Sequence, residues 1–277
     1  MKKIVKLLFI FLLFQSCINQ KITQKDVFNP VKEYELDSNF NFSRYFIKKT
    51  DTSKLESWYI TENNAQFNLI YFSGNGSNIR SAIPFFNELG DQFDLNIFSF
   101  NYSGYGLSEG IPTINGIVSD ANLSIDFFTN KLANKDIPTF ILGYSLGGYV
   151  ALNIINHDSI DKGIILSSFS SLNELEEYLI KEALPFVIRP FLKLEVDESI
   201  YELNNLTLVK ETTKPLLFIH GENDVFIPPS MSYQLFNISK SKNKLIKIIE
   251  NADHRMVLKD SSSNKQVIRE IRQFIKL

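Results

Sequence analysis

The sequence has one cysteine, three histidines and no excess of either charge. Its 277 residues hold 29 lysines and arginines against 31 aspartates and glutamates, and there is no Arg-rich run or basic patch. This balance excludes the electrostatic surface with which proteins bind nucleic acid. The single cysteine, Cys17, excludes an intramolecular disulfide, and no clustered histidines, cysteines and carboxylates have the spacing of metal ligands. We therefore expect no disulfide, no metal site and no cofactor.

The first 17 residues, MKKIVKLLFIFLLFQSC, have the pattern of a secretory signal. Two lysines precede an apolar stretch that is too short to span a bilayer as a free helix. The lone Cys17 resembles the lipidated cysteine of bacterial lipoproteins, although Phe14-Gln15-Ser16 departs from their usual Leu-small-small run. We predict a signal peptide at residues 1–16 and a lipid anchor on Cys17, which would hold the protein on a bacterial membrane, in the cell envelope and outside the cytoplasm. A plain signal peptide with an incidental Cys17 is the alternative.

The chain after Cys17 divides into a polar segment and a long regular region. Residues 18–37 are polar and lack a sustained period, so we predict a lipidated tether at residues 17–39. From residue 40 to residue 277, short apolar segments that end in glycines or polar residues alternate with amphipathic segments of helical spacing. This alternation predicts one α/β domain with a mostly parallel central sheet and helices on both faces. Glutamates and two prolines interrupt the alternation at about residues 169–209, which we predict to be a small helical cap.

A serine between two glycines stands where a predicted strand meets a predicted helix. Gly143-Tyr144-Ser145-Leu146-Gly147 has the form G-x-S-x-G, which in this context indicates the turn that presents a nucleophilic serine. Glycines are needed there because the serine backbone is strained and its neighbours crowd one another. A glycine-rich turn with a serine N-cap is the structural alternative. The N–H of Leu146, at the helix N-terminus, is the first expected donor to an oxyanion.

A serine hydroxyl needs a base that takes its proton, and the chain has only three histidines to consider for this role. His157 lies late in the helix after Ser145, on the wrong side of the sheet, and His220 is expected to shape its own loop. His254, which follows the last predicted strand in NADHRMVL, is the candidate base. A surface-loop histidine is the alternative for this residue.

The acid that orients the histidine is expected between serine and histidine in the chain. Asp224, in HGENDVFIP, follows a predicted strand and is the candidate. Glu222 is a nearby carboxylate that we do not assign to this role, and Asp253 is too close to His254 in the sequence to be its usual partner. The loop SGNGSN supplies the second expected oxyanion donor, the N–H of Asn75.

From residue 40 onward the sequence resembles the α/β-hydrolase superfamily. The motifs that carry the resemblance are YFSGNGSNI, NYSGYGLSEG, GYSLGG, HGENDVFIP and NADH, in the superfamily's order. The most similar branch is that of serine aminopeptidase-like and acyl-esterase-like enzymes with a small helical cap. The resemblance implies a triad of Ser145, Asp224 and His254, with Asn75 and Leu146 at the oxyanion hole.

Three positions depart from the superfamily's pattern. Ser73 stands where a histidine is usual, and Asn101 and Ser103 replace the aspartate and arginine of Asp-x-Arg-Gly. In the superfamily these side chains support the loops around the site, so we expect their replacement to affect efficiency and substrate range more than the class of reaction.

The expected function is that of a serine hydrolase which cleaves ester, thioester or amide bonds of small or acyl substrates through an acyl-enzyme. Two alternatives stay open. An aminopeptidase-like serine peptidase would need a carboxylate in the cap to hold a substrate amine, and Glu174, Glu176, Glu177 or Glu182 could supply it. A non-catalytic binding module on a hydrolase scaffold is suggested by the altered supporting residues. The expected partners are the substrate and the membrane, and the sequence carries no signal for an oligomeric state.

Overall fold

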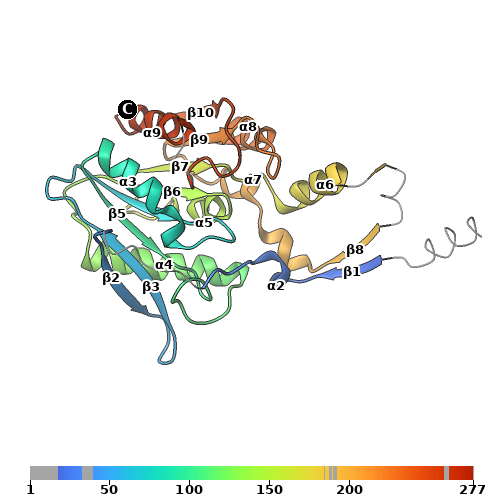
Figure 1. The fold of residues 1–277 in the computed structure, drawn as a ribbon, viewed down its shortest axis with the longest axis horizontal. Helices are drawn as coiled ribbons and strands as arrows, with labels where there is room; N and C mark the ends of the chain where they lie inside the picture. Colours follow the sequence, from blue (N-terminus) through green and yellow to red (C-terminus); the bar gives the residue numbers. More distant parts are fainter. Residues whose placement is uncertain are drawn as a thin grey trace, which may run out of the picture.

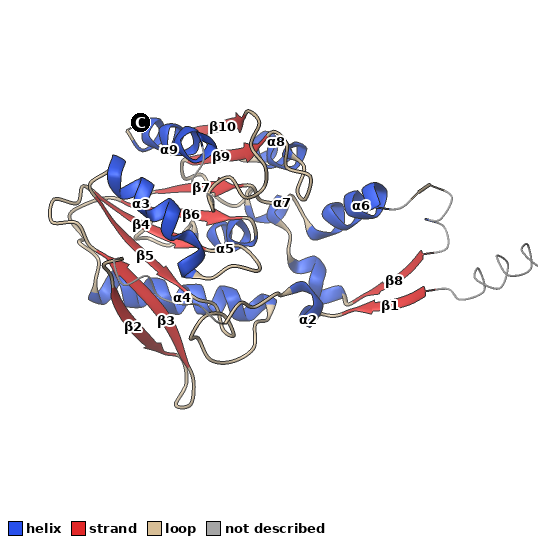
Figure 2. Ribbon diagram, in the orientation of Figure 1, coloured by secondary structure: helices blue, strands red, loops and turns tan. Residues whose placement is uncertain are grey.

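A computed structural model describes residues 18–32, 40–183, 185–186, 189, 192–258 and 262–276 of the chain. Eight of its strands form one sheet in the order β10-β9-β7-β6-β4-β5-β3-β2, drawn in Figures 1 and 2. Their bounds are β2 Ser43–Lys48, β3 Lys54–Ile60, β4 Phe67–Phe72, β5 Leu95–Phe100, β6 Thr139–Tyr144, β7 Lys162–Leu166, β9 Leu216–Gly221 and β10 Lys244–Ile249. Only the pairings of β3 with β2 and with β5 are antiparallel in this sheet. The predicted mostly parallel α/β architecture is confirmed.

Helices cover both faces of the sheet because its central strands are apolar on both sides. Every residue of β5, β6 and β9 is buried. Side chains of α3 (Ile83–Gln92) and α9 (Ser262–Ile275) pack into one apolar cluster, and those of α4 (Ile114–Lys131), α5 (Leu146–Ile154) and α8 (Pro229–Ile238) pack into the other. The amphipathic face expected on α4, which includes Ile117, Ala121 and Phe128, is buried in the second cluster. The two clusters make one core divided by the sheet.

The cap lies between β7 and β9 and is helical only in part. It comprises α6 (Leu172–Ala183), β8 (Leu192–Val196), the 3-10 helix η3 (Glu198–Glu202) and the short helix α7 (Asn205–Leu208). Strand β8 pairs in parallel with β1 (Ile18–Ile22), and Figure 1 shows the two strands side by side next to α6. The sequence did not predict β8, because its partner strand lies near the other end of the chain.

The segment expected to be a tether contacts the domain wherever it is described. Residues 18–32 form β1, a single turn of helix, α2 (Gln24–Val27), and an extended stretch in which Phe28 is buried in the core. Residues 18–32, the described part of the predicted tether, therefore pack against the domain. Its few apolar side chains follow no sustained period, yet they are enough to pack against the cap.

Cys17 and the signal peptide predicted at residues 1–16 lie outside the described residues. Within the described ranges, no helix has the length and apolar character needed to cross a membrane.

Candidate active site

Ser145 lies in the sharp turn from β6 to α5, with a backbone φ of 55° and ψ of −116°. Positive φ is costly for a residue with a side chain and is found where the surrounding structure enforces it. Here the enforcement comes from close packing on both sides of the serine. A Cβ on Gly143 would lie 2.1 Å from the carbonyl oxygen of Gly147, and a Cβ on Gly147 would lie 2.1 Å from that of Phe72. The two glycines are therefore a steric requirement of the turn.

Hydrogen bonds on both sides of Ser145 fix the strained backbone. Its N–H donates to the carbonyl of Leu166 over 2.8 Å, and its own carbonyl accepts from the Ser168 hydroxyl over 2.8 Å. Leu166 is the last residue of β7 and Ser168 lies two residues beyond it, so the turn is held from the neighbouring position in the sheet.

The structure brings Ser145, Asp224 and His254 together at the carboxyl ends of β6, β9 and β10. The distance from His254 Nε2 to Ser145 Oγ is 3.2 Å, and that from His254 Nδ1 to Asp224 Oδ2 is 2.6 Å. Because an ionised carboxylate only accepts, Nδ1 carries the proton and Nε2 is free to accept the one of Ser145. The Tyr144 hydroxyl donates to the carbonyl of His254 over 2.9 Å, which ties the histidine loop to β6.

The Asp224 side chain is inaccessible to solvent and is surrounded by donors. Its Oδ1 accepts the N–H groups of Phe226 and Ile227 over 3.0 and 2.9 Å, and its Oδ2 faces His254 and His220. Burial by itself raises the pKa of the Asp224 carboxyl, but the hydrogen bonds from His220 and His254 and the positive charge of His254 hold the pKa well below its ordinary value. The surroundings of Asp224 thus favour its ionised form.

His220, which the sequence placed only in its own loop, contacts Asp224 in the structure. It is fully buried, with Nε2 2.8 Å from the Ile227 carbonyl oxygen and 3.2 Å from Asp224 Oδ2. Both oxygens are acceptors, so Nε2 carries a proton and donates to them. Nδ1 lies 2.6 Å from the hydroxyl of Ser232, at the start of α8. The four-residue spacing of His220 and Asp224 across the end of β9 was the signal in the sequence.

The two residues expected at the oxyanion hole both line the cavity into which Ser145 opens. Leu146 is the first residue of α5, where a backbone N–H has no acceptor within the helix. The loop of Asn75 passes close to Ser145, since a Cβ on Gly74 would lie 3.2 Å from the Cβ of Ser145.

Two of the three departures from the superfamily's pattern still make supporting contacts. Asn101 Oδ1 accepts the N–H of Ile79 over 2.9 Å, directly after the Asn75 loop, and its Nδ2 donates to Glu56 Oε2 over 2.8 Å. The Ser103 hydroxyl accepts from Lys49 Nζ over 2.9 Å, and its N–H donates to the buried Asp120. The Ser73 hydroxyl, where the superfamily has a histidine, is buried without a hydrogen-bond partner in the described part of the chain.

The sequence profile of the prolyl oligopeptidase family matches residues 119–277. The chain belongs to the prolyl oligopeptidase family. It is also similar over 264 residues to YfhR of Escherichia coli K12, at 27% identity and with 91% of this chain and 88% of YfhR covered. Protein bem46 of Schizosaccharomyces pombe is 25% identical over 214 residues, which cover 74% of this chain and 68% of bem46.

Solved structures of hydrolases share the fold of this family member. An esterase of Pyrococcus furiosus superposes with a TM-score of 0.69 at 20% identity, over 90% of this chain and 97% of the esterase. Monoglyceride lipase of Saccharomyces cerevisiae, in complex with a substrate analogue, gives a TM-score of 0.67 at 16% identity, over 87% and 97% of the two chains. The predicted α/β-hydrolase fold is confirmed, and the family and its neighbours support a hydrolase.

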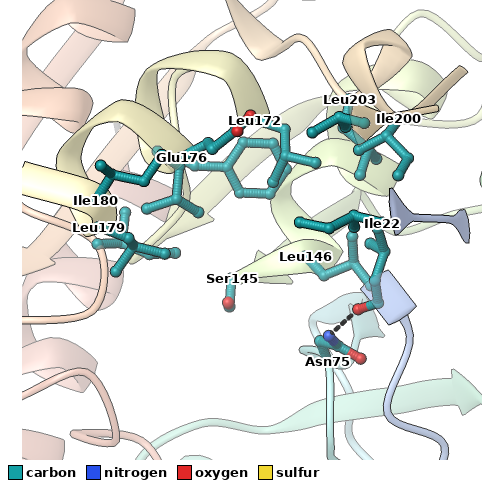
Figure 3. Close-up of a pocket in the computed structure, with 15 residues that line it drawn as sticks. Ile22, Asn75, Ser145, Leu146, Leu172, Glu176, Leu179, Ile180, Ile200 and Leu203 are labelled. Atoms are coloured by element: carbon teal, nitrogen blue, oxygen red, sulfur yellow. Dashed lines mark hydrogen bonds between the residues drawn. The ribbon is translucent and has the colours of Figure 1, made fainter. Parts of the chain in front are cut away.

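Two cavities of this prolyl oligopeptidase family member meet at Ser145. The first, of about 400 Å³, lies under the cap and is drawn in Figure 3. Its lining residues are Ile22, Val27, Asn75, Ser145, Leu146, Phe169, Leu172, Leu175, Glu176, Leu179, Ile180, Val196, Ile200, Leu203 and Ile227. The second, of about 550 Å³, opens on the side of His254 and includes Arg255 and the exposed ring of Phe226. Both volumes lie in the range of ligand pockets.

Among the described residues, no group of three or more histidine, cysteine, aspartate or glutamate side chains is arranged to hold a metal ion.

Proposed function

We propose that this protein is a serine hydrolase that cleaves esters of apolar acyl groups, with Ser145 as nucleophile, His254 as base and Asp224 as the acid that orients it. The observation that carries the proposal is the unbroken chain of hydroxyl, imidazole and carboxylate, which ends in an apolar cavity at the hydroxyl. In such a chain the buried carboxylate fixes the histidine tautomer and stabilises the imidazolium that forms.

The geometry supports a two-step acyl transfer. His254 Nε2 takes the proton of Ser145 as Oγ bonds to the substrate carbonyl carbon, and the N–H groups of Leu146 and Asn75 stabilise the oxyanion. When the carbon–oxygen bond to the leaving group breaks, the same Nε2–H protonates the departing alkoxide. Water, activated by His254, then attacks the acyl-enzyme and releases the carboxylic acid.

The cavities suggest where each half of the substrate lies. The leaving group has to depart beside His254, and His254 lines the second cavity but not the one under the cap. The acyl chain therefore occupies the cavity under the cap. Twelve of the fifteen residues that line this cavity are Ile, Leu, Val or Phe, which suits a hydrocarbon chain.

A fluorophosphonate probe on the purified protein lacking residues 1–17 tests the nucleophile directly. We expect rapid labelling of the wild type and none of Ser145→Ala. An unlabelled wild type with a cooperative unfolding transition would contradict the proposal and favour a binding module. A series of p-nitrophenyl esters from acetate to decanoate then measures the acyl preference, and we expect kcat/KM to rise with chain length until the cavity is filled.

A peptidase that holds a substrate amine is the second candidate, and one residue favours it. Glu176 is the one charged residue among those that line the cavity under the cap, and its Oε2 accepts the Tyr201 hydroxyl over 3.0 Å. Aminoacyl p-nitroanilides test this candidate. Hydrolysis that exceeds that of the esters and is lost in Glu176→Gln would support the peptidase.

We also propose that Cys17 carries the lipid anchor, as the sequence pattern predicts. Expression of the full chain in bacteria fed an alkyne-bearing fatty acid tests it. Label in the wild type and its loss in Cys17→Ala support the anchor, and an unlabelled wild type in the soluble envelope fraction contradicts it.

A further inference from the structure

The segment from Ile22 to Val31, which we name the N-terminal strap, contacts the loop expected to supply the second oxyanion donor. The strap N–H of Asn29 donates to Asn75 Oδ1 over 2.8 Å, and Asn75 Nδ2 donates to the strap carbonyl of Val27 over 2.6 Å. Figure 3 draws the second of these bonds beside Ser145. The Asn75 side chain is therefore held at both of its polar ends by the backbone of the strap.

The arrangement of donors and acceptors fixes the orientation of the Asn75 amide. An N–H can only donate and a carbonyl can only accept, so a flipped amide would face a donor with a donor and an acceptor with an acceptor. A third bond, from the Tyr105 hydroxyl to Asn75 Oδ1 over 2.8 Å, supports the same orientation from the domain. With its amide fixed, Asn75 has little freedom to rotate its backbone away from Ser145.

Further contacts hold the strap against the domain next to this loop. The Val31 carbonyl accepts the N–H of Gly106 over 2.8 Å, and the Phe28 ring is buried in the core. Gly76, which follows Asn75, has a φ of +69°, and a Cβ there would lie 3.1 Å from Asn29 Nδ2. The tight turn of the loop and the strap are thus in direct contact.

The strap also reaches the cavity under the cap. Ile22 and Val27 line this cavity together with Ser145 and Asn75. A segment that looks like a spacer in the sequence is therefore part of the wall around the reacting atoms.

We propose that the N-terminal strap is a positioning element of the active site, which acts through the Asn75 side chain to hold the oxyanion loop in place for acyl transfer. The proposal rests on the proposed serine hydrolase function and adds to it a requirement for residues ahead of the hydrolase core. Loss of a complete oxyanion donor lowers kcat by about 10²–10³-fold in other serine hydrolases. Loss of one bond that positions the donor is expected to cost less, about tenfold in kcat.

A pair of substitutions at Asn29 isolates the bond from the strap to Asn75. Asn29→Pro removes the N–H, and Phe28 already has the extended backbone, with ψ of 136°, that a residue before proline requires. Asn29→Ala removes the same side chain and keeps the N–H, so it is the matched control. We expect kcat of Asn29→Ala to exceed that of Asn29→Pro by about tenfold, with p-nitrophenyl acetate and with p-nitrophenyl octanoate alike.

The two substrates separate positioning from a loss of pocket structure. A strap that only walls the cavity would change KM for octanoate and leave kcat for acetate unaltered. Equal kcat values for the two Asn29 variants on acetate, with melting temperatures like that of the wild type, would overturn the proposal.

If Asn29→Pro does not fold, Asn75→Asp serves as the second variant. Its carboxylate can still accept from Asn29 but presents an oxygen to the Val27 carbonyl, so kcat on acetate is expected to fall at pH 7 by a similar factor, about tenfold. A kcat within twofold of the wild type would overturn the proposal.

Fluorophosphonate labelling of the wild type keeps the two proposals apart. If the wild type labels at Ser145 and the two Asn29 variants have equal kcat values, only the strap proposal fails. If the wild type does not label, the hydrolase proposal fails and the kinetic comparison with it.

Discussion

Replacing His220 with phenylalanine tests the buried histidine beside Asp224. Phenylalanine keeps a planar aromatic ring but has no ring nitrogen, so three contacts are lost together. The Ser232 hydroxyl and the Ile227 carbonyl lose a partner, and Asp224 loses one of its donors. Asp224 keeps the bonds from His254, Phe226 and Ile227, and is expected to remain ionised at neutral pH.

The structure sets the size of the effect on stability. The Ser232 and Ile227 groups are both buried, and an unsatisfied buried polar group costs about 1–3 kcal/mol. We therefore expect His220→Phe to lower the free energy of unfolding by about 2–6 kcal/mol, out of the total of about 5–15 kcal/mol typical of a domain.

A double-mutant cycle in urea measures the contact itself. Ser232→Ala removes the hydroxyl that His220→Phe would leave unpaired, so the double variant should be less destabilised than the two single variants added together, by about 0.5–3 kcal/mol. Circular dichroism follows the unfolding. Additive free energies, or a cost of His220→Phe below about 1 kcal/mol, would refute the hydrogen-bond arrangement derived for His220.

Three further predictions follow from the site. Asp224→Asn should lower kcat for p-nitrophenyl esters by about 10⁴-fold because the histidine loses its tautomer control, and a loss below tenfold would contradict the triad. Burial raises the pKa of Asp224, but its histidine donors lower the pKa below the unfolded value of 3.8. The stability that these donors provide is complete above pH 3.8 and is lost as the pH falls through the folded pKa. The difference in unfolding free energy between wild type and Asp224→Asn should therefore shrink from pH 6 to pH 3. Leu172→Trp should fill the cavity under the cap, because Leu172 lines it. We expect kcat/KM for octanoate to fall by more than about tenfold and that for acetate to stay within about twofold, since each methylene left unburied costs about 0.8 kcal/mol. An unchanged ratio of the kcat/KM values for the two substrates would argue against this cavity as the acyl site.

The fold and the chemical groups of the site were predictable because both are local in the sequence. Apolar segments of strand length that alternate with amphipathic segments specify a parallel sheet, and residues that follow parallel strands meet at one edge of it. Ser145, Asp224 and His254 each follow such a strand, so their meeting required no knowledge of side-chain contacts.

The packing of residues 18–32 against the domain was not predictable, because this segment has too few apolar positions for a recognisable period. Strands β1 and β8 form only as partners of each other, and they come from opposite parts of the chain. A short strand gains its stability from its neighbour, so neither could be recognised alone.

The sequence by itself determined the fold class, the strained turn at Ser145 and the meeting of Ser145, Asp224 and His254 at one edge of the sheet, because these depend on hydrophobic period, glycine sterics and strand order. Only the tertiary structure decided that His220 lies against Asp224, that the strap holds Asn75 and that an apolar cavity adjoins Ser145. Each of these depends on atoms that approach within a few ångströms from segments far apart in the chain. Such approaches are set by how the whole core packs, and no single stretch of sequence encodes them.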